Sequence, residues 1–294
     1  MRLTLVTVTA WVWIAACGSA ESFVEGIGDA ENAVFSEDGR LFVSGGTNAY
    51  EVIEAARGRS ARPLYAGTCN FTGIVVRGQV LYTACVSGAI GQSPAYLLAA
   101  ELNAMPQLRI IHEFERAVTP NGMTFDAQGR LFVADATALQ SQLVVITLDA
   151  ADPLTVASEQ VWLGGFTFLN GLRYFDGTLY ATDLNLIESI AIQPDGSPGA
   201  LRVLASSLTV FDDLLPSADG ILVADFLGGR LALYSLSGGL VARTAPLFAN
   251  PSSVILGRAP LVPDQALLVT EKGEIGELES SNGNRVSTFR PRLQ

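Results

Sequence analysis

Residues 121–135 read Asn-Gly-Met-Thr-Phe-Asp-Ala-Gln-Gly-Arg-Leu-Phe-Val-Ala-Asp, which predicts an apolar strand, a turn and a second apolar strand. The same arrangement recurs, so six such units can be aligned along the chain, and they begin at residues 31, 72, 121, 170, 212 and 252. Their second strands begin at residues 41, 81, 131, 179, 221 and 267. Repeats of about 40–50 residues with several strands each are typical of β-propellers.

The sequence therefore predicts an all-β fold, a six-bladed β-propeller with four antiparallel strands per blade. In the third unit the expected strands are 121–125, 131–135, 142–149 and 156–163. The composition agrees with this fold, since 49% of the residues are hydrophobic and only 16% are charged. Sheets that pack face to face bury both faces of most strands and therefore need many hydrophobic residues. A propeller of this size is one domain, and no linker-like segment interrupts it.

The N-terminal segment has the features of an export signal. Residues 3–16 are apolar, follow Arg2 and are too few to span a bilayer as a stable helix. Ile14-Ala15-Ala16-Cys17-Gly18 resembles a bacterial lipobox, so we expect a lipoprotein signal peptide at 1–16, lipidated Cys17, a tether at 17–24 and a propeller at 25–294. An ordinary signal peptide cleaved near Ala20 and an uncleaved anchor are the alternatives. The expected location is the bacterial envelope, with the chain exported to the periplasm and lipid-anchored, and the outer membrane is favoured.

Two further cysteines, Cys69 and Cys85, flank one predicted hairpin. In an exported protein such a pair is a candidate disulfide, and the hairpin places the two cysteines nearly opposite, offset by about two residues. The alternative is a pair of buried thiols.

The net charge of −11 argues against a nucleic-acid partner, which would need a basic patch. It is compatible with a cation site. We expect a monomer whose membrane contact is the lipid anchor.

The residue that begins each unit is polar in all six units. The first strand of every blade lines the channel of a propeller, so these residues should form a ring around the axis. Ca²⁺ prefers oxygen ligands, and histidine and cysteine, which would indicate zinc, are missing from the ring. We expect Ca²⁺, or another divalent cation; the alternative is that the Asn and Asp side chains cap strands or form Asx turns. The ring comprises Glu31, Thr72, Asn121, Asn170, Asp212 and Ser252.

This ring resembles that of the calcium propellers of the gluconolactonase and senescence-marker (regucalcin) family and of the related paraoxonases. The resemblance covers roughly residues 25–290 and rests on a blade-one Glu, two Asn-Gly strand starts and a blade-five Asp. It implies hydrolysis of lactones or related esters. It also implies that the metal ligands are Glu31, Asn121, Asn170 and Asp212. The sequence departs in two places: Glu31 lacks the following Gly-Pro-x-Trp, and Thr72 stands where paraoxonases carry a histidine.

The expected chemistry is metal-assisted hydrolysis of a small-molecule lactone or ester. A calcium ion would polarise the carbonyl, and Asp212, or Asp213 beside it, would accept a proton from water. The sequence contains one histidine, His112, so a histidine dyad is excluded. His112 lies in a predicted outer strand. The alternative function is a non-catalytic propeller that binds a ligand or protein and keeps calcium structurally. For the substrate rim we expect Thr72, Phe168, Phe211 and Phe226, although each aromatic could instead pack between blades.

Overall fold

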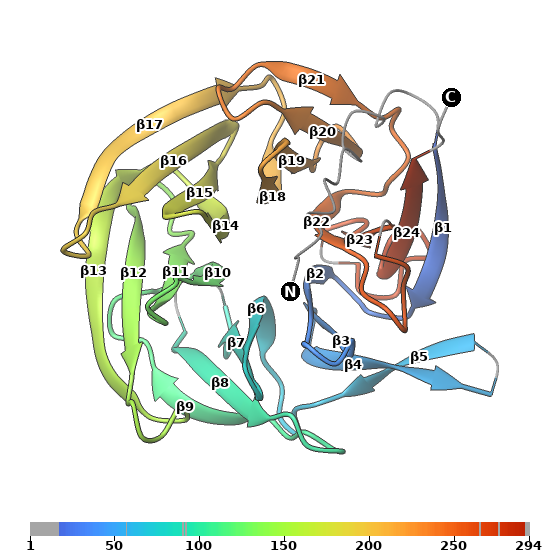
Figure 1. Ribbon diagram of the computed structural model, residues 1–294. Coiled ribbons are helices and arrows are strands. Elements are labelled where there is room, and N and C mark those ends of the chain that lie inside the picture. Colours follow the sequence, from blue (N-terminus) through green and yellow to red (C-terminus); the bar gives the residue numbers. More distant parts are fainter. Residues whose placement is uncertain are drawn as a thin grey trace, which may run out of the picture.

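The computed structural model describes residues 18–291, except residues 57, 90, 92, 265 and 276. It confirms a six-bladed propeller in which every blade is a four-stranded antiparallel sheet (Figure 1). The described residues contain no helix. The signal peptide expected at 1–16 and the lipidation expected at Cys17 lie outside the described residues.

Each blade is a meander whose first strand lies nearest the axis (Figure 1). Blade one consists of β2 (Ala30–Phe35), β3 (Leu41–Gly45), β4 (Asn48–Ala55) and β5 (Gly58–Pro63). Blade two consists of β6 (Asn70–Arg77), β7 (Val80–Val86), β8 (Ala95–Glu101) and β9 (Arg109–Glu113). Blade three consists of β10 (Pro120–Phe125), β11 (Leu131–Asp135), β12 (Ser141–Leu148) and β13 (Val156–Phe166).

The remaining three blades follow the same pattern. Blade four consists of β14 (Leu169–Phe175), β15 (Thr178–Asp183), β16 (Leu186–Ile192) and β17 (Pro198–Ser206). Blade five consists of β18 (Phe211–Ser217), β19 (Gly220–Asp225), β20 (Arg230–Tyr234) and β21 (Leu240–Arg243). Blade six consists of β22 (Pro251–Leu256), β23 (Leu267–Glu271), β24 (Arg285–Pro291) and β1 (Gly18–Glu25).

The sixth blade closes the ring with the N-terminal strand. β1 pairs antiparallel with β24, from Gly18 opposite Pro291 to Glu25 opposite Arg285, and the two ribbons lie side by side in Figure 1. The tether expected at 17–24 is therefore wrong from Gly18 onward. These residues form a strand because the outer edge of β24 offers backbone hydrogen bonds that a propeller must satisfy. The folded domain thus begins at least seven residues earlier than the predicted residue 25.

A β-bulge interrupts the first strand of every blade near its start. The pairing register with the second strand shifts at one place in each of the six blades, for example between Pro120 and Met123 and between Phe211 and Leu214. A bulge bends the strand and re-aims a side chain. In each blade it lies at the position of the predicted ring.

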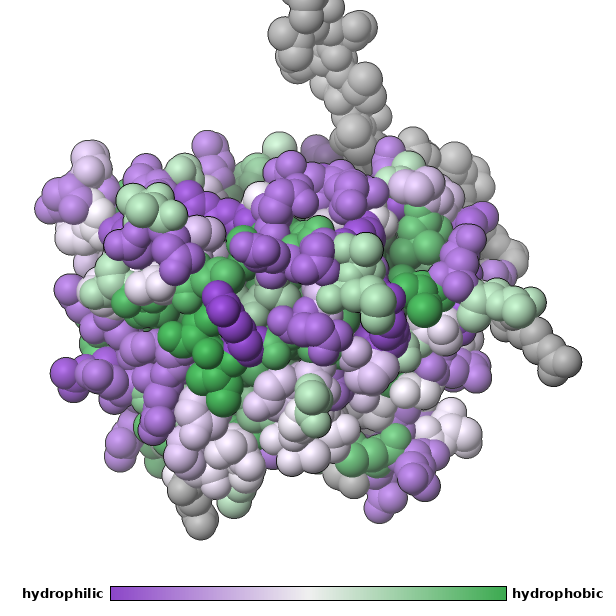
Figure 2. All heavy atoms as spheres, turned by 90° about the horizontal axis from the view of Figure 1, so that it is seen from below, coloured by the Kyte–Doolittle hydropathy of each residue, from purple (hydrophilic) through white to green (hydrophobic). Residues whose placement is uncertain are grey.

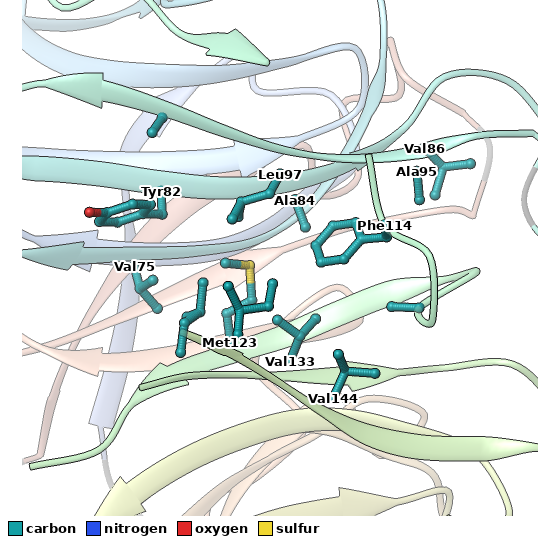
Figure 3. Packing of buried hydrophobic residues seen from close by; sticks show 14 of the residues in the cluster. Val75, Tyr82, Ala84, Val86, Ala95, Leu97, Phe114, Met123, Val133 and Val144 are labelled. Atoms are coloured by element: carbon teal, nitrogen blue, oxygen red, sulfur yellow. The ribbon is translucent and has the colours of Figure 1, made fainter. Parts of the chain in front are cut away.

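The core consists of layers between neighbouring blades, as sheet-on-sheet packing requires. Figure 3 shows the layer between blades two and three, where Leu97 and Phe114 face Met123, Val133 and Val144. These side chains are at most 8% exposed. The hydrophobic pattern was thus a reliable guide to the core, because both faces of most strands are covered by neighbouring blades.

Blade two contains a disulfide between Cys69 and Cys85, with a Cα–Cα distance of 5.8 Å. Phe71 pairs with Cys85, so Cys69 is offset by two residues, as the hairpin predicted.

From the side, polar side chains and apolar patches share the rim of the disc (Figure 2). The described part of the chain holds no helix with the length and hydrophobicity to cross a bilayer.

Candidate metal centre

Three of the four predicted ligands present a buried oxygen that has no hydrogen-bond partner. These atoms are Asn121 Oδ1, Asn170 Oδ1 and Asp212 Oδ1, on the first strands of three consecutive blades. Buried polar atoms are normally hydrogen-bonded, so unpaired oxygens at equivalent positions indicate a ligand that the chain alone does not supply. This argues against the alternative of simple strand caps.

The fourth predicted ligand, Glu31, is buried at 2% exposure and forms an ion pair. Its Oε2 accepts a hydrogen bond from Lys272 Nζ, and the same ammonium lies 3.6 Å from Asp29 Oδ1. Burial, followed by repulsion from Glu31, raises the pKa of Asp212 well above its ordinary value, while Lys272 opposes the shift. The carboxylates of Glu31 and Asp212 therefore lie close enough to repel, which a bound cation would relieve.

Glycines explain how the first strands approach one another at this ring. A Cβ built on Gly122 would collide with the carbonyl oxygen of Asn170, and one on Gly171 would lie 2.6 Å from the Cα of Asp213. Each Asn-Gly pair thus places the amide at the ring and lets the next strand come into contact. The glycine that follows the asparagine is the sequence signal of this close approach.

Hydroxyl groups that sequence reasoning missed hold the backbone of the two carboxylates. Thr182 Oγ1 donates to the carbonyl oxygen of Asp212, and Thr270 Oγ1 donates to that of Glu31 at 2.9 Å. Each threonine lies on the second strand of the preceding blade, opposite the bulge. A buried hydroxyl within an apolar second strand is the signal that could have found them.

Asp213 lies in a second polar layer rather than in the ring. Its Oδ2 accepts hydrogen bonds from Arg173 and, at 2.7 Å, from Ser253 Oγ. Arg173 also reaches Asn32 Oδ1 at 3.4 Å, so it links the first strands of blades four, five and one across the channel. Burial raises the pKa of Asp213, although Arg173 and the hydrogen bond from Ser253 act in the opposite direction. Asp213 is thus paired through Oδ2, while its Oδ1, like Asp212 Oδ1, is buried without a hydrogen-bond partner.

Four acidic side chains at the ends of the second strands order the loops of the same face. Asp135 accepts from Thr119 N at 2.8 Å, Asp183 from Thr167 N at 2.9 Å, and Glu271 from Ala249 N at 2.7 Å. Asp225 accepts from Gly228 N at 2.9 Å. Because these carboxylates bind backbone amides, they are structural residues and are not further metal ligands.

Two of the four predicted rim residues, Phe211 and Phe226, are buried. Phe211 is 1% exposed and packs edge-on against Tyr234, with ring centroids 5.9 Å apart, so its assignment to the rim is wrong. Phe226 is likewise buried at 8% exposure, and Phe168 is half-buried. Thr72 Oγ1 donates to Pro120 O at 2.7 Å and links blades two and three. Phe211 is thus enclosed by blades four and five, and Thr72 is bonded to the neighbouring blade.

Exposed leucines occupy the loops of this face instead. Leu139, Leu208 and Leu227 lie on loops of blades three to five, at the end where the first strands begin, and are at least 61% exposed. The hydrophobic pattern of the sequence does not identify such residues, because loops have no periodic pattern.

Two cavities open at the opposite face. One of about 680 Å³ lies at the far end of the channel and is lined by Phe35, Met123, Arg173 and Arg258 among others. Another of about 1050 Å³ lies between blades two and three, lined by Arg77, Tyr82 and Arg130 among others, and contains no ring residue.

His112, on β9, pairs with Glu159 at 2.8 Å, so it belongs to an outer strand as predicted.

The donor set suits a hard cation. Within residues 18–291, gaps aside, no group of three or more His, Cys, Asp or Glu side chains is arranged to hold a metal ion. The ring instead combines two carboxylates with two amide oxygens, a mixture typical of Ca²⁺ and unlike zinc sites. The unpaired ring oxygens fit such an ion.

The fold belongs to a known class, the six-bladed propellers that include gluconolactonases and regucalcin. A gluconolactonase from Xanthomonas campestris matches with a TM-score of 0.70 and 15% identity over 99% of this chain and 94% of that one. Regucalcin from Agrobacterium tumefaciens, described as a calcium-binding protein, matches with a TM-score of 0.69 and 14% identity over 96% and 97%.

A propeller of different chemistry is also similar. The aldose sugar dehydrogenase from Streptomyces coelicolor, in its PQQ-bound form, matches with a TM-score of 0.62 and 16% identity over 94% and 98% of the chains. No protein-family model matches the sequence, and no curated protein matches it. At these identities the likeness defines the fold, and function must be argued from the site.

Proposed function

We propose that this protein is a calcium-dependent hydrolase of lactones or related esters. The observation that carries the proposal is the set of unpaired, buried oxygens of Asn121, Asn170 and Asp212, which share a ring with Glu31. The gluconolactonase among the similar structures supports the reaction class, and the calcium-binding regucalcin supports the ion.

In this proposal Glu31, Asn121, Asn170 and Asp212 hold the cation. When bound, it supplies Lewis-acid polarisation of the substrate carbonyl and stabilises negative charge on that oxygen. Asp212 or the adjacent Asp213 would accept a proton from the attacking water, since the buried Oδ1 of each lacks a hydrogen-bond partner, whereas Oδ2 of Asp213 is held by Arg173 and Ser253. Asp213 also neutralises Arg173 through Oδ2.

The exposed leucines of the ring face favour an apolar substrate over a sugar lactone. Leu139, Leu208 and Leu227 surround this face from three blades, and exposed apolar groups of this kind often mark binding surfaces. We further propose that the protein is exported and anchored in the bacterial envelope through Cys17, where this face would meet apolar esters.

The test is calcium titration of the purified protein, combined with hydrolysis assays on aliphatic and sugar lactones with and without chelator. Asp212→Asn should weaken calcium binding at least about 100-fold and abolish turnover, since it removes a charged ligand. Asp219→Asn, at an exposed turn of the same blade, is the matched control and should change neither. Absence of calcium binding would refute the site. Calcium binding without turnover of any lactone would favour a non-catalytic binding propeller.

A further inference from the structure

Lys272 is the only lysine in the 294-residue sequence, in which every other basic residue except His112 is an arginine. It follows Glu271, the last residue of β23, and so lies at the face where the first strands begin. Its side chain points at the predicted metal ligands rather than into solvent.

The Lys272 ammonium pairs with the same carboxylate that the cation would use. Nζ donates to Glu31 Oε2 and lies 3.6 Å from Asp29 Oδ1. Glu31 and Lys272 are 241 residues apart in the sequence. The Glu31 side chain is 3% exposed and the Lys272 side chain 20%. The pair is therefore largely shielded from water. In such an environment Coulomb interactions are stronger than at the protein surface.

The backbone of Lys272 is held while its side chain retains a route to solvent. Lys272 N donates to Asn250 O at 3.1 Å, and Glu271 is fixed by Ala249 N and Arg285. The lysine side chain has a flexible four-carbon stem, so the ammonium can leave Glu31 without movement of β23.

Two cations bound near the ring would repel each other. Lys272 is the cation paired with the acidic group at this ring, since it contacts Glu31 and lies 3.6 Å from Asp29. A divalent cation bound to Glu31 would repel an ammonium that contacts the same carboxylate. A lysine side chain is protonated at neutral pH, so the competitor carries a positive charge.

We propose that Lys272 is a tethered cation that competes with the divalent cation for Glu31 and thereby weakens metal binding. The inference rests on the proposed cation site and adds a residue that sets its affinity. In the metal-free protein Lys272 stabilises the carboxylates of the ring, and on metal binding its ammonium moves toward solvent.

Calcium titration calorimetry on wild type and three variants tests the competition. Lys272→Met should bind calcium about tenfold more tightly or better, because a repelling charge is removed. Lys272→Arg keeps the charge and should bind like wild type. Arg202→Met, which removes an exposed positive charge on β17, should also bind like wild type. Thermal melts establish that each variant is folded.

Amine labelling provides an independent readout, because Lys272 has the only side-chain amine. An acylating reagent followed by peptide mass spectrometry should modify Lys272 slowly without calcium and faster with it. Unchanged or weaker binding by folded Lys272→Met overturns the inference and leaves the cation site intact. Labelling that calcium does not accelerate also overturns it. If neither wild type nor Lys272→Met binds calcium, the proposed site and the inference both fail.

Discussion

Thr270 Oγ1 of the sixth blade donates a hydrogen bond of 2.9 Å to the carbonyl oxygen of Glu31 in the first. The bond joins the two blades at which the ring closes and fixes the backbone of one predicted metal ligand. Thr182 makes the same contact to Asp212 between blades four and five. The two carboxylates of the ring are therefore held by hydroxyls of the preceding blades, while the amides of Asn121 and Asn170 follow blades that carry alanine at this position.

We predict that Thr270→Val, which removes this hydroxyl at nearly constant shape, destabilises the protein by about 1–3 kcal/mol because a buried carbonyl loses its partner. Calcium binding should weaken about tenfold, since residues that orient ligands tune affinity. Urea unfolding and calcium titration measure the two effects. Thr244→Val is the matched control: its buried hydroxyl donates to Ala245 O at 2.8 Å, after the outermost strand of blade five. A similar loss of calcium affinity in both variants would contradict the assigned role.

The approach of neighbouring first strands yields a second prediction. Gly122→Ala should destabilise the protein by about 1–3 kcal/mol, because the new methyl group meets the Asn170 backbone. Gly164→Ala on β13 is the control, since its Cβ would have no heavy atom within 4 Å. Thermal unfolding should therefore separate the two variants. Equal stability of both would show that the strands do not depend on this contact.

The disulfide of blade two should contribute to stability by restricting the unfolded chain. Cys69 and Cys85 are separated by 16 residues, and loops of this size correspond to about 3 kcal/mol in the chain-entropy treatment. Replacing both by serine should lower the free energy of unfolding by about 2–4 kcal/mol. Urea unfolding with and without reductant checks this: reductant should weaken wild type and leave the double variant unchanged. A wild type that is insensitive to reductant would count against the bond.

Glu188 predicts a pH dependence of stability. Its side chain is 3% exposed with Oε2 unpaired, and burial, with a smaller effect of Asp183, raises its pKa to about 7 from 4.5. Because the folded state holds this proton more tightly than the unfolded state, the contribution of Glu188 to stability falls as pH rises from about 4.5 to about 7.

Glu188→Gln should accordingly raise the melting temperature at pH 8 relative to wild type, and the gain should shrink toward pH 5. The measurement is thermal unfolding at both pH values. Glu101→Gln, at the exposed end of β8, serves as control and should show no such difference. A gain that is equal at both pH values would exclude titration of Glu188 as its cause.

The sequence repeat by itself determines the propeller. Blade three shows why: the predicted strands 121–125, 131–135, 142–149 and 156–163 lie within about three residues of β10, β11, β12 and β13. Apolar alternation and turn glycines are local signals, and each blade repeats them. The ring of polar strand starts was readable for the same reason, since equivalent positions in a repeat meet at the axis.

Tertiary structure alone decided what those ring residues contact. The pairing of Glu31 with Lys272 joins residues 241 positions apart, and the pairing of Asp213 with Arg173 and Ser253 joins three blades. Residue 211 looked like a rim aromatic, yet blades four and five enclose it. β1 looked like a tether because its pairing partner lies at the other end of the chain. Local sequence specifies strands and turns, whereas charge pairing and burial depend on which distant strands closure brings together.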